Sequence, residues 1–277
     1  MIELVEATVL AEQLNKTIRG KRIKNVVAAQ SPHKFAWFFG DPQAYNSLLS
    51  GKIIGESVGY GGQLEIKAED TVILFNDGVS IKYHDQIEEV PKKHQLLIEF
   101  DDSSAISASV QMYGGLSCFH DGANENPYYL VAKEKPSPLS DNFDKEYFNH
   151  IFSTPEMDKL SAKAFLATEQ RIPGLGNGVL QDILFYAGIH PKRKIKTFTE
   201  EEKNKLFKVI KSTLSTMIKQ GGRDTEKDLF GNYGGYQTVV SKNTVDKPCP
   251  VCGTLIQKEA YLGGSVYYCS ECQRKPE

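Results

Sequence analysis

The feature that most constrains this chain is a set of four cysteines near its end. The motifs CPVC, at residues 249–252, and CSEC, at residues 269–272, are two C-x-x-C pairs with sixteen residues between them. Each pair forms a tight turn that aims two thiolates at one point, and two such turns complete a tetrahedron. All four positions are then filled by protein. The sequence therefore predicts one structural Zn²⁺, with the ligands Cys249, Cys252, Cys269 and Cys272.

The stretch TLIQKEAYLGGSVYY between the two pairs predicts a β-hairpin. A hairpin of this size is too small for a core of its own, and we expect it to present a loop to a partner. The alternative, a pair of disulfides, is disfavoured in a cytoplasmic compartment. For the fifth cysteine, Cys118, we expect a buried free thiol.

A glycine-rich turn in EQRIPGLGNGVLQDILFYAGIHPKRK joins two predicted helices. Glycines such as Gly176 permit tight or left-handed backbone. A helix that begins near Asn177 exposes unpaired N–H groups, which suit a phosphate. In the alternative interpretation, Asn177 only caps the helix and the glycines only let two helices pack. Taken alone, the turn leaves both interpretations open.

The chain opens with MIELVEATVL, which places Glu3 and Glu6 beside the α-amine. The simpler interpretation is the first turn of a helix, where acids face the positive end of the dipole. In the other interpretation the amine is a nucleophile and the acids serve it. An α-amine has a pKa of about 7.7–8.0, so an appreciable neutral fraction exists at pH 7.

The pattern between these motifs predicts an α+β, multi-domain chain. Short runs rich in β-branched and aromatic residues fill residues 22–113 and predict a β-sandwich or barrel after the leading helix. Prolines and charges at 132–144 indicate a boundary, and helical spacing follows. We predict domains at 1–135, 136–245 and 246–277. In the segment 31–45, Trp37, Phe38 and Phe39 fit a core better than a pocket.

The charge is unevenly distributed. Residues 1–140 carry 13 Lys+Arg and 18 Asp+Glu, whereas residues 141–277 carry 20 and 17, so polyanion contact is expected in the second half. No apolar run approaches the length of a membrane span, and no basic, apolar leader opens the chain. We expect a cytoplasmic, nucleoid-associated monomer without membrane contact.

These features in this order resemble the formamidopyrimidine-DNA glycosylase and endonuclease VIII family of base-excision repair, over nearly the whole chain. MIELVEA matches its opening motif, ATEQRIPGLGNGVLQDILFYAGIHPKR its helix–two-turns–helix motif, and KPCPVCG…YYCSECQ its zinc finger. The resemblance implies an N-terminal β-sandwich with a leading helix, followed by a helix–two-turns–helix domain with a zinc-finger hairpin. The implied activity is a DNA glycosylase, with AP lyase action, on damaged double-stranded DNA.

The resemblance also implies roles for individual residues. The N-terminal amine, at Ile2 in the family's register, attacks C1′ of a flipped-out nucleotide, Glu3 donates a proton, and Glu6 positions the sugar and amine. In the helical domain, Lys163 and Asn177, with Gly176 in the same turn, contact phosphate. Tyr113 falls where the family carries an aromatic wedge.

The sequence departs from the family at several of these positions. Ile2 replaces the catalytic proline, Asp77 stands where a methionine wedge is expected, and Gly264 replaces the zinc-finger arginine. Two other interpretations therefore stay open. One is a non-catalytic damaged-DNA-binding protein, and the other is a zinc-ribbon module that binds RNA or protein.

Overall fold

The computed structural model describes residues 1–274. The chain folds as two compact units. The first unit combines Met1–Lys133 with Glu226–Tyr233, and the second combines Glu134–Thr225 with the described residues from Gly234 onward. The helices from α4 (Lys145–Phe152) onward and the cysteine-rich hairpin thus belong to the second unit. The division of the chain into three domains stays a prediction.

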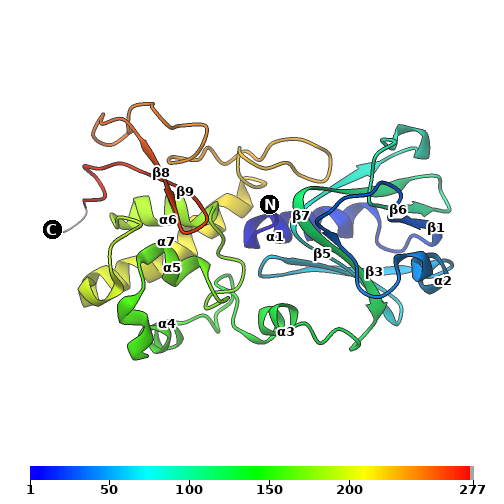
Figure 1. Ribbon diagram of the computed structural model, residues 1–277, viewed down its shortest axis with the longest axis horizontal. Helices are drawn as coiled ribbons and strands as arrows, with labels where there is room; N and C mark the ends of the chain where they lie inside the picture. The colour runs from blue at the N-terminus through cyan, green and yellow to red at the C-terminus, as the bar shows by residue number, and fades with distance from the viewer. Residues whose placement is uncertain (275–277) are drawn as a thin grey trace. The chain divides into compact units, whose positions relative to one another are not determined.

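One sheet and three helices make up the first unit (Figure 1). Its strands run in the order β1-β6-β7-β5-β4-β3, and β2 pairs in parallel with β7. The elements are α1 (Leu4–Thr17), β1 (Ile23–Ala28), β2 (Ala36–Trp37), α2 (Tyr45–Leu49), β3 (Ile54–Tyr60), β4 (Gln63–Ala68), β5 (Thr71–His84), β6 (Leu96–Phe100), β7 (Ala105–His120) and α3 (Pro127–Glu134).

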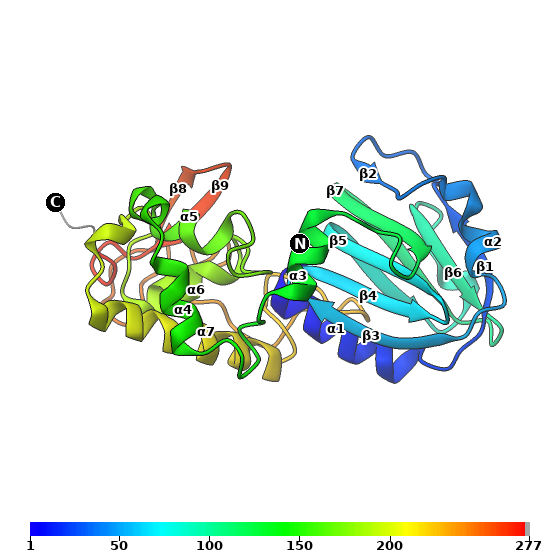
Figure 2. The ribbon, with the colours of Figure 1, turned by 90° about the horizontal axis from the view of Figure 1, so that it is seen from below.

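The predicted β-sandwich is confirmed, and its two layers are continuous through the long strands β5 and β7. The start of β5 pairs with β4 and with the end of β7, whereas the start of β7 pairs with β6 and the end of β5. The register shifts between Asp77 and Val79, where the strands pass from one layer to the other. Figure 2 shows β3, β4, β5 and β7 side by side in one of these layers.

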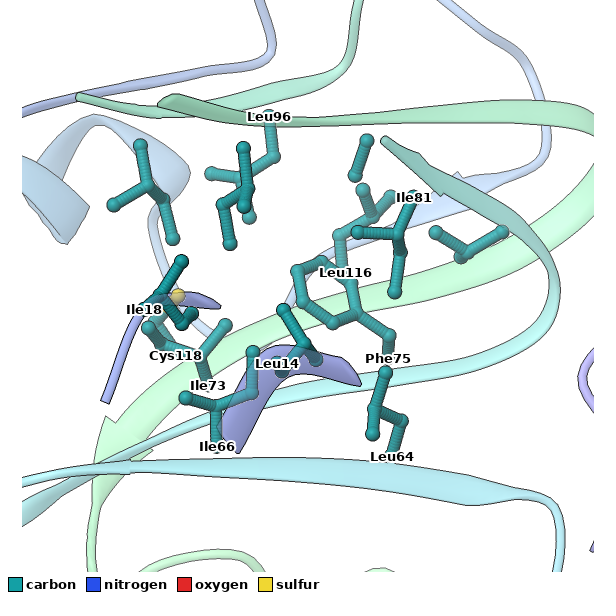
Figure 3. Close-up of a cluster of buried hydrophobic side chains, with 14 of the residues drawn as sticks. Leu14, Ile18, Leu64, Ile66, Ile73, Phe75, Ile81, Leu96, Leu116 and Cys118 are labelled. Atoms are coloured by element: carbon teal, nitrogen blue, oxygen red, sulfur yellow. The ribbon is translucent and has the colours of Figure 1, made fainter. Parts of the chain in front are cut away.

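The core of the first unit fills the space between the layers and α1 (Figure 3). Alternation along β4 turns Leu64 and Ile66 inward and leaves Glu65 on the other face. Leu14 of the leading helix and Ile18, its C-terminal cap residue, join the same core. These elements hold the start of the chain at the edge of a rigid sandwich.

The second unit is mainly helical, with one two-stranded sheet. A capping box at Thr199 and Glu202 begins one of its helices, and a left-handed cap at Gly188 (φ 75°) ends another. One helix begins at Val179 with Gly178 as its cap, not at Asn177. The elements are α4 (Lys145–Phe152), α5 (Ala162–Ala167), α6 (Val179–Ala187), α7 (Glu200–Lys219), β8 (Gln257–Tyr261) and β9 (Gly264–Tyr268). Within residues 1–274, no helix is both long and apolar enough to cross a bilayer.

Candidate functional site

The α-amine of the chain belongs to Met1, and it donates to Oε2 of Glu226 at 2.6 Å. Both the backbone and the side chain of the next residue, Ile2, are held in place. The N–H of Ile2 donates to the carbonyl of Asp77 at 2.6 Å, and the Ile2 side chain is buried in the core. With Met1 present, the nitrogen of Ile2 is a peptide nitrogen, so the primary amine lies one residue before the position that the family resemblance indicates.

Glu3 and Glu6 form a reciprocal capping box at the start of α1. The N–H of Glu3 donates to Oε2 of Glu6 at 3.2 Å, while the Glu3 carboxylate accepts from the Glu6 backbone. Both side chains are almost fully buried, with 4% and 6% of their surface exposed. The helix-start interpretation is therefore confirmed, and the same geometry holds two carboxylates within a few residues of the amine.

The start of the chain contacts a bend within β5, at Asp77 and Gly78, which faces β7. Asp77 adopts a left-handed backbone (φ 54°), and Gly78 passes so close to β7 that a Cβ there would lie 2.4 Å from the Tyr113 carbonyl oxygen. Residues 111–113 of β7 oppose this bend without a register partner in β5. They protrude, and Met112 is 69% exposed.

Sequence reasoning singled out Tyr113 but missed Met112. The alternation of Ser109, Val110, Gln111 and Met112 is regular and predicts a buried Met112, so no sequence signal marked it. The structure shows Gln111 and Met112 as two consecutive exposed residues in a strand whose other positions are mostly buried. An exposed methionine on a bulge is an apolar side chain with no core partner to explain it.

Carboxylates dominate the electrostatics of this region. Burial raises the pKa of Asp77 above its usual range. Burial, followed by the charges of Asp77 and Glu3, likewise raises the pKa of the Tyr113 hydroxyl. The acid whose contact with the Met1 amine the structure describes is Glu226, which can accept a proton from that amine.

A cavity of about 780 Å³ opens beside Asp77 in the first unit. Trp37, Phe38 and Phe39 line it, and Trp37 and Phe39 are 52% and 38% exposed. The expected place in the core is therefore wrong for Trp37 and Phe39, whose rings are exposed at the end of β2 and just beyond it. Phe38 alone also packs against the core.

In the second unit, the structure brings Lys163 and Asn177 together at the turn of the hairpin. Lys163 Nζ donates to the Tyr261 carbonyl at 2.5 Å, and Asn177 Nδ2 donates to the Ser265 carbonyl at 2.9 Å. A Cβ at Gly264 would lie 3.4 Å from both nitrogens. The position of the missing family arginine thus adjoins the two predicted phosphate contacts.

Three further observations describe this corner. Only 4% of Lys163 is exposed, and burial lowers the pKa of its ammonium. The Oδ1 atom of Asn177 is buried and accepts no hydrogen bond from the described residues. The carbonyl of Gly176 accepts from the N–H of Leu180 at 3.3 Å, which draws the glycine-rich turn into the start of α6.

The cysteines meet as the sequence predicts. The four sulfur atoms lie within 4.8 Å of one another, with 3.8 Å between Cys249 and Cys272 and 3.4 Å between Cys252 and Cys269. A tetrahedral ion with four thiolate bonds of about 2.3 Å keeps its sulfur atoms about 3.8 Å apart. The cluster is therefore consistent with one structural zinc ion, and its closed ligand set leaves no position for substrate.

Comparison with known proteins identifies a matching domain and relatives. The model of the formamidopyrimidine-DNA glycosylase H2TH domain matches residues 135–228. The formamidopyrimidine-DNA glycosylase of Shouchella clausii is 28% identical over 282 residues, covering 99% of this chain and 98% of the relative. That of Histophilus somni strain 2336 is 34% identical over 156 residues, which span 55% of this chain and only 56% of the relative's length.

Solved structures share the fold over the full chain. The MutM (Fpg) protein of Thermus thermophilus superposes with a TM-score of 0.82 at 22% identity, covering 99% of this chain and all of that one. Lactococcus lactis Fpg, solved in complex with DNA containing an abasic site, gives 0.83 at 24% identity with the same coverage. The domain match, the full-length relatives and the common fold agree: the chain contains the H2TH domain of formamidopyrimidine-DNA glycosylases and is similar to these proteins over its full length.

Proposed function

We propose that this chain is a DNA glycosylase of base-excision repair that binds damaged duplex DNA and acts on a flipped-out nucleotide through its N-terminal amine. The observation that carries the proposal is the Met1 amine, held 2.6 Å from Glu226 and two residues from the buried Glu3. Relatives along the full length of the chain carry the glycosylase name, and the Lactococcus lactis protein was solved on abasic DNA. Such an enzyme works on the cell's DNA, at the nucleoid.

The proposed reaction uses the groups at the chain start in sequence. The base is first flipped, because C1′ and the glycosidic bond are inaccessible inside the stack. The neutral amine attacks C1′, the glycosidic bond breaks, and the base leaves with the bonding electrons and a proton from Glu3. A carboxylate takes a proton from the amine nitrogen and passes it to O4′, so that the C1′–O4′ bond breaks and a protonated imine forms. Loss of a C2′ proton from this imine would then expel the 3′ phosphate and cut the strand, which is the AP lyase step.

The remaining predicted contacts are assigned to binding. We propose that Lys163, Gly176 and Asn177 hold a phosphate next to the hairpin turn, and that Tyr113 together with the exposed Met112 fills the gap left by the flipped base. In this proposal, residues 1–135 carry the chemistry, and 136–245 and 246–277 grip the backbone. The unpartnered Oδ1 of Asn177 and the adjoining ammonium support the phosphate assignment.

Replacing Glu3 by glutamine tests the catalytic part. Glutamine keeps an oxygen that can cap α1, so folding is preserved, but it cannot donate a carboxyl proton. We expect release of a damaged base to fall by about 10²–10⁴-fold, while the thermal midpoint stays near that of the native protein. Glu12→Gln, on the exposed side of the same helix, is the matched control. Unchanged base release by Glu3→Gln on every responsive lesion would remove Glu3 from the mechanism.

A second candidate, a non-catalytic reader of damaged DNA, is favoured by the loss of proline at position 2. Borohydride trapping on duplexes with abasic, oxidised and alkylated sites separates the two. A covalent adduct at the N-terminal residue supports the enzyme. Binding without adduct and without base release supports the reader. Preference for structured RNA over damaged duplex in a competition assay would instead support a zinc-ribbon binding module.

A further inference from the structure

The proposed attack by the amine does not involve the cavity beside Asp77. Its floor comes from the outer face of the β4–β5–β7 layer, opposite the core, and its walls come from the aromatic segment at 37–39, the loop at 123–126 and the start of α3. Its volume, about 780 Å³, lies within the range of about 300–1,000 Å³ that small-molecule sites occupy. All of its lining residues belong to the first unit.

Aromatic rings form the walls and remain accessible. Trp37, Phe39 and Tyr128 are 52%, 38% and 61% exposed, which is high for rings of this size. Phe39 is braced by Phe119, with ring centroids 5.3 Å apart, and Trp37 lies 6.0 Å from Tyr113. Exposed rings that are held in place offer faces on which a flat ligand can stack.

Amide side chains on the floor offer hydrogen bonds at fixed positions. Asn76 Oδ1 accepts from the Gly115 N–H at 2.9 Å, and Asn76 Nδ2 donates to Gln63 Oε1 at 3.1 Å. On the loop, the buried Asn124 accepts from the N–H of Asn126 at 2.9 Å. Each amide keeps further donor or acceptor capacity after these bonds. Such a set suits the polar edge of a heterocycle.

The charge of the residues that line the cavity favours some heterocycles over others. Asp77 and Glu125 contribute carboxyl groups, whereas no Lys, Arg or His is among the described residues that line the cavity. A phosphate or another anion would meet carboxylates without a counter-charge. A cationic ring would gain from the carboxylates and from the faces of Trp37 and Phe39.

We propose that this cavity binds a positively charged, N-alkylated purine base. The inference rests on the proposed glycosylase function and names its lesion class. The carbonyl of Asp77 holds the N–H of Ile2, so the cavity opens where the chain start is anchored. Alkylation at a ring nitrogen places a positive charge on the base, and the base leaves as a neutral molecule once the glycosidic electrons return to it. A lesion of this class therefore needs less proton donation than a neutral oxidised base.

The cavity carries its own reporter, since Trp37 is the single tryptophan of the chain. Titration with 7-methylguanosine should quench its fluorescence, and guanosine should bind about 10-fold more weakly because it lacks the charge. N-acetyltryptophanamide controls for collisional quenching. Glu125→Gln should weaken the binding of 7-methylguanosine and leave that of guanosine unchanged. Glu88→Gln removes the same charge from an exposed position outside the lining and should change neither.

Equal affinity for both nucleosides would overturn the charge argument, and no saturable quenching by either would overturn the site. A duplex carrying 7-methylguanine then distinguishes a base delivered by DNA from a free nucleoside. Faster base release from this duplex than from one with 8-oxoguanine supports the lesion class, and the reverse order overturns it. Borohydride trapping of native protein on an abasic duplex is run in parallel. A protein that traps abasic DNA but ignores 7-methylguanosine refutes the cavity assignment and leaves the glycosylase proposal standing.

Discussion

The α-amine of Met1 donates to the carboxylate of Glu226 across 2.6 Å, although the two residues are 225 positions apart. The pair is partly solvated, with 41% and 29% of the two side chains exposed, so it adds little to stability. Its value lies in position, since it fixes the one primary amine that adjoins Glu3. Most of the protein's length separates the proposed nucleophile from the residue that orients it.

Glu226→Gln should therefore reduce chemistry more than stability. We expect the single-turnover rate of borohydride trapping on an abasic duplex to fall by about 10- to 100-fold, because a misplaced reactant loses most of its effective concentration. The thermal midpoint should barely move. Glu201→Gln, exposed on α7, is the control. A trapping rate equal to that of native protein would show that Glu226 does not position the amine.

Met112→Ala should impair action on duplex DNA alone. If the exposed side chain on the β7 bulge replaces stacking lost on base flipping, its removal should slow base release from a duplex by about 10-fold, equivalent to about 1.4 kcal/mol. Release from a single strand, which has no stack to hold open, should be unchanged. Leu139→Ala, an exposed apolar residue of the second unit, controls for surface effects. An equal loss on both substrates would contradict the wedge role.

The raised pKa of Asp77 predicts a pH-dependent stability. The folded protein holds this proton more tightly than the unfolded chain, so stability falls as pH rises between about 3.9 and the higher folded value. Asparagine cannot ionise and tolerates the left-handed backbone at this position. Asp77→Asn should raise the thermal midpoint by about 2 °C at pH 7, and the gain should shrink as pH approaches 4. In calorimetry, Asp85→Asn controls for the removal of an exposed carboxylate, and a gain for Asp77→Asn that stays constant at all pH values would refute the assignment.

Cys269→Ser should release the metal and weaken binding to duplex DNA. Three thiolates bind zinc less tightly than four, and the hairpin that contacts Lys163 and Asn177 loses its fold without the ion. Metal analysis should find one zinc per native chain and much less in the variant. Cys118→Ala, which removes the buried thiol outside the cluster, should keep its zinc. Duplex affinity that survives chelation would separate the hairpin from DNA binding.

Local signals made much of this fold predictable. The spacing of the two C-x-x-C pairs determines the geometry of the metal site. The capping box at Thr199 and Glu202 depends on four consecutive residues. Gly188 ends α6 because a left-handed cap suits glycine. Alternation along β4 likewise follows from the pleat of the strand. In each case the residues that decide the structure are neighbours in sequence.

The candidate site was harder to predict from the sequence, because it depends on contacts between segments that are distant along the chain. Nothing near Met1 indicates a partner at Glu226, and nothing in the strand pattern places the bend at Asp77 and Gly78. Trp37 and Phe39 are a second case in which the sequence alone predicts the wrong environment. Their hydrophobicity predicts burial, whereas the structure leaves both rings exposed, Trp37 at the end of β2 and Phe39 just beyond it.

The first unit is built from two separate stretches of chain, and Glu226 lies in the later one. During synthesis the sandwich emerges from the ribosome long before that stretch, and an early domain begins to fold as it emerges. The Met1 amine therefore cannot pair with the Glu226 carboxylate until translation has passed Tyr233. A product stalled earlier would carry the sandwich without the group proposed to orient its first residue, so the proposed nucleophile is assembled only after the segment between the two stretches has been synthesised.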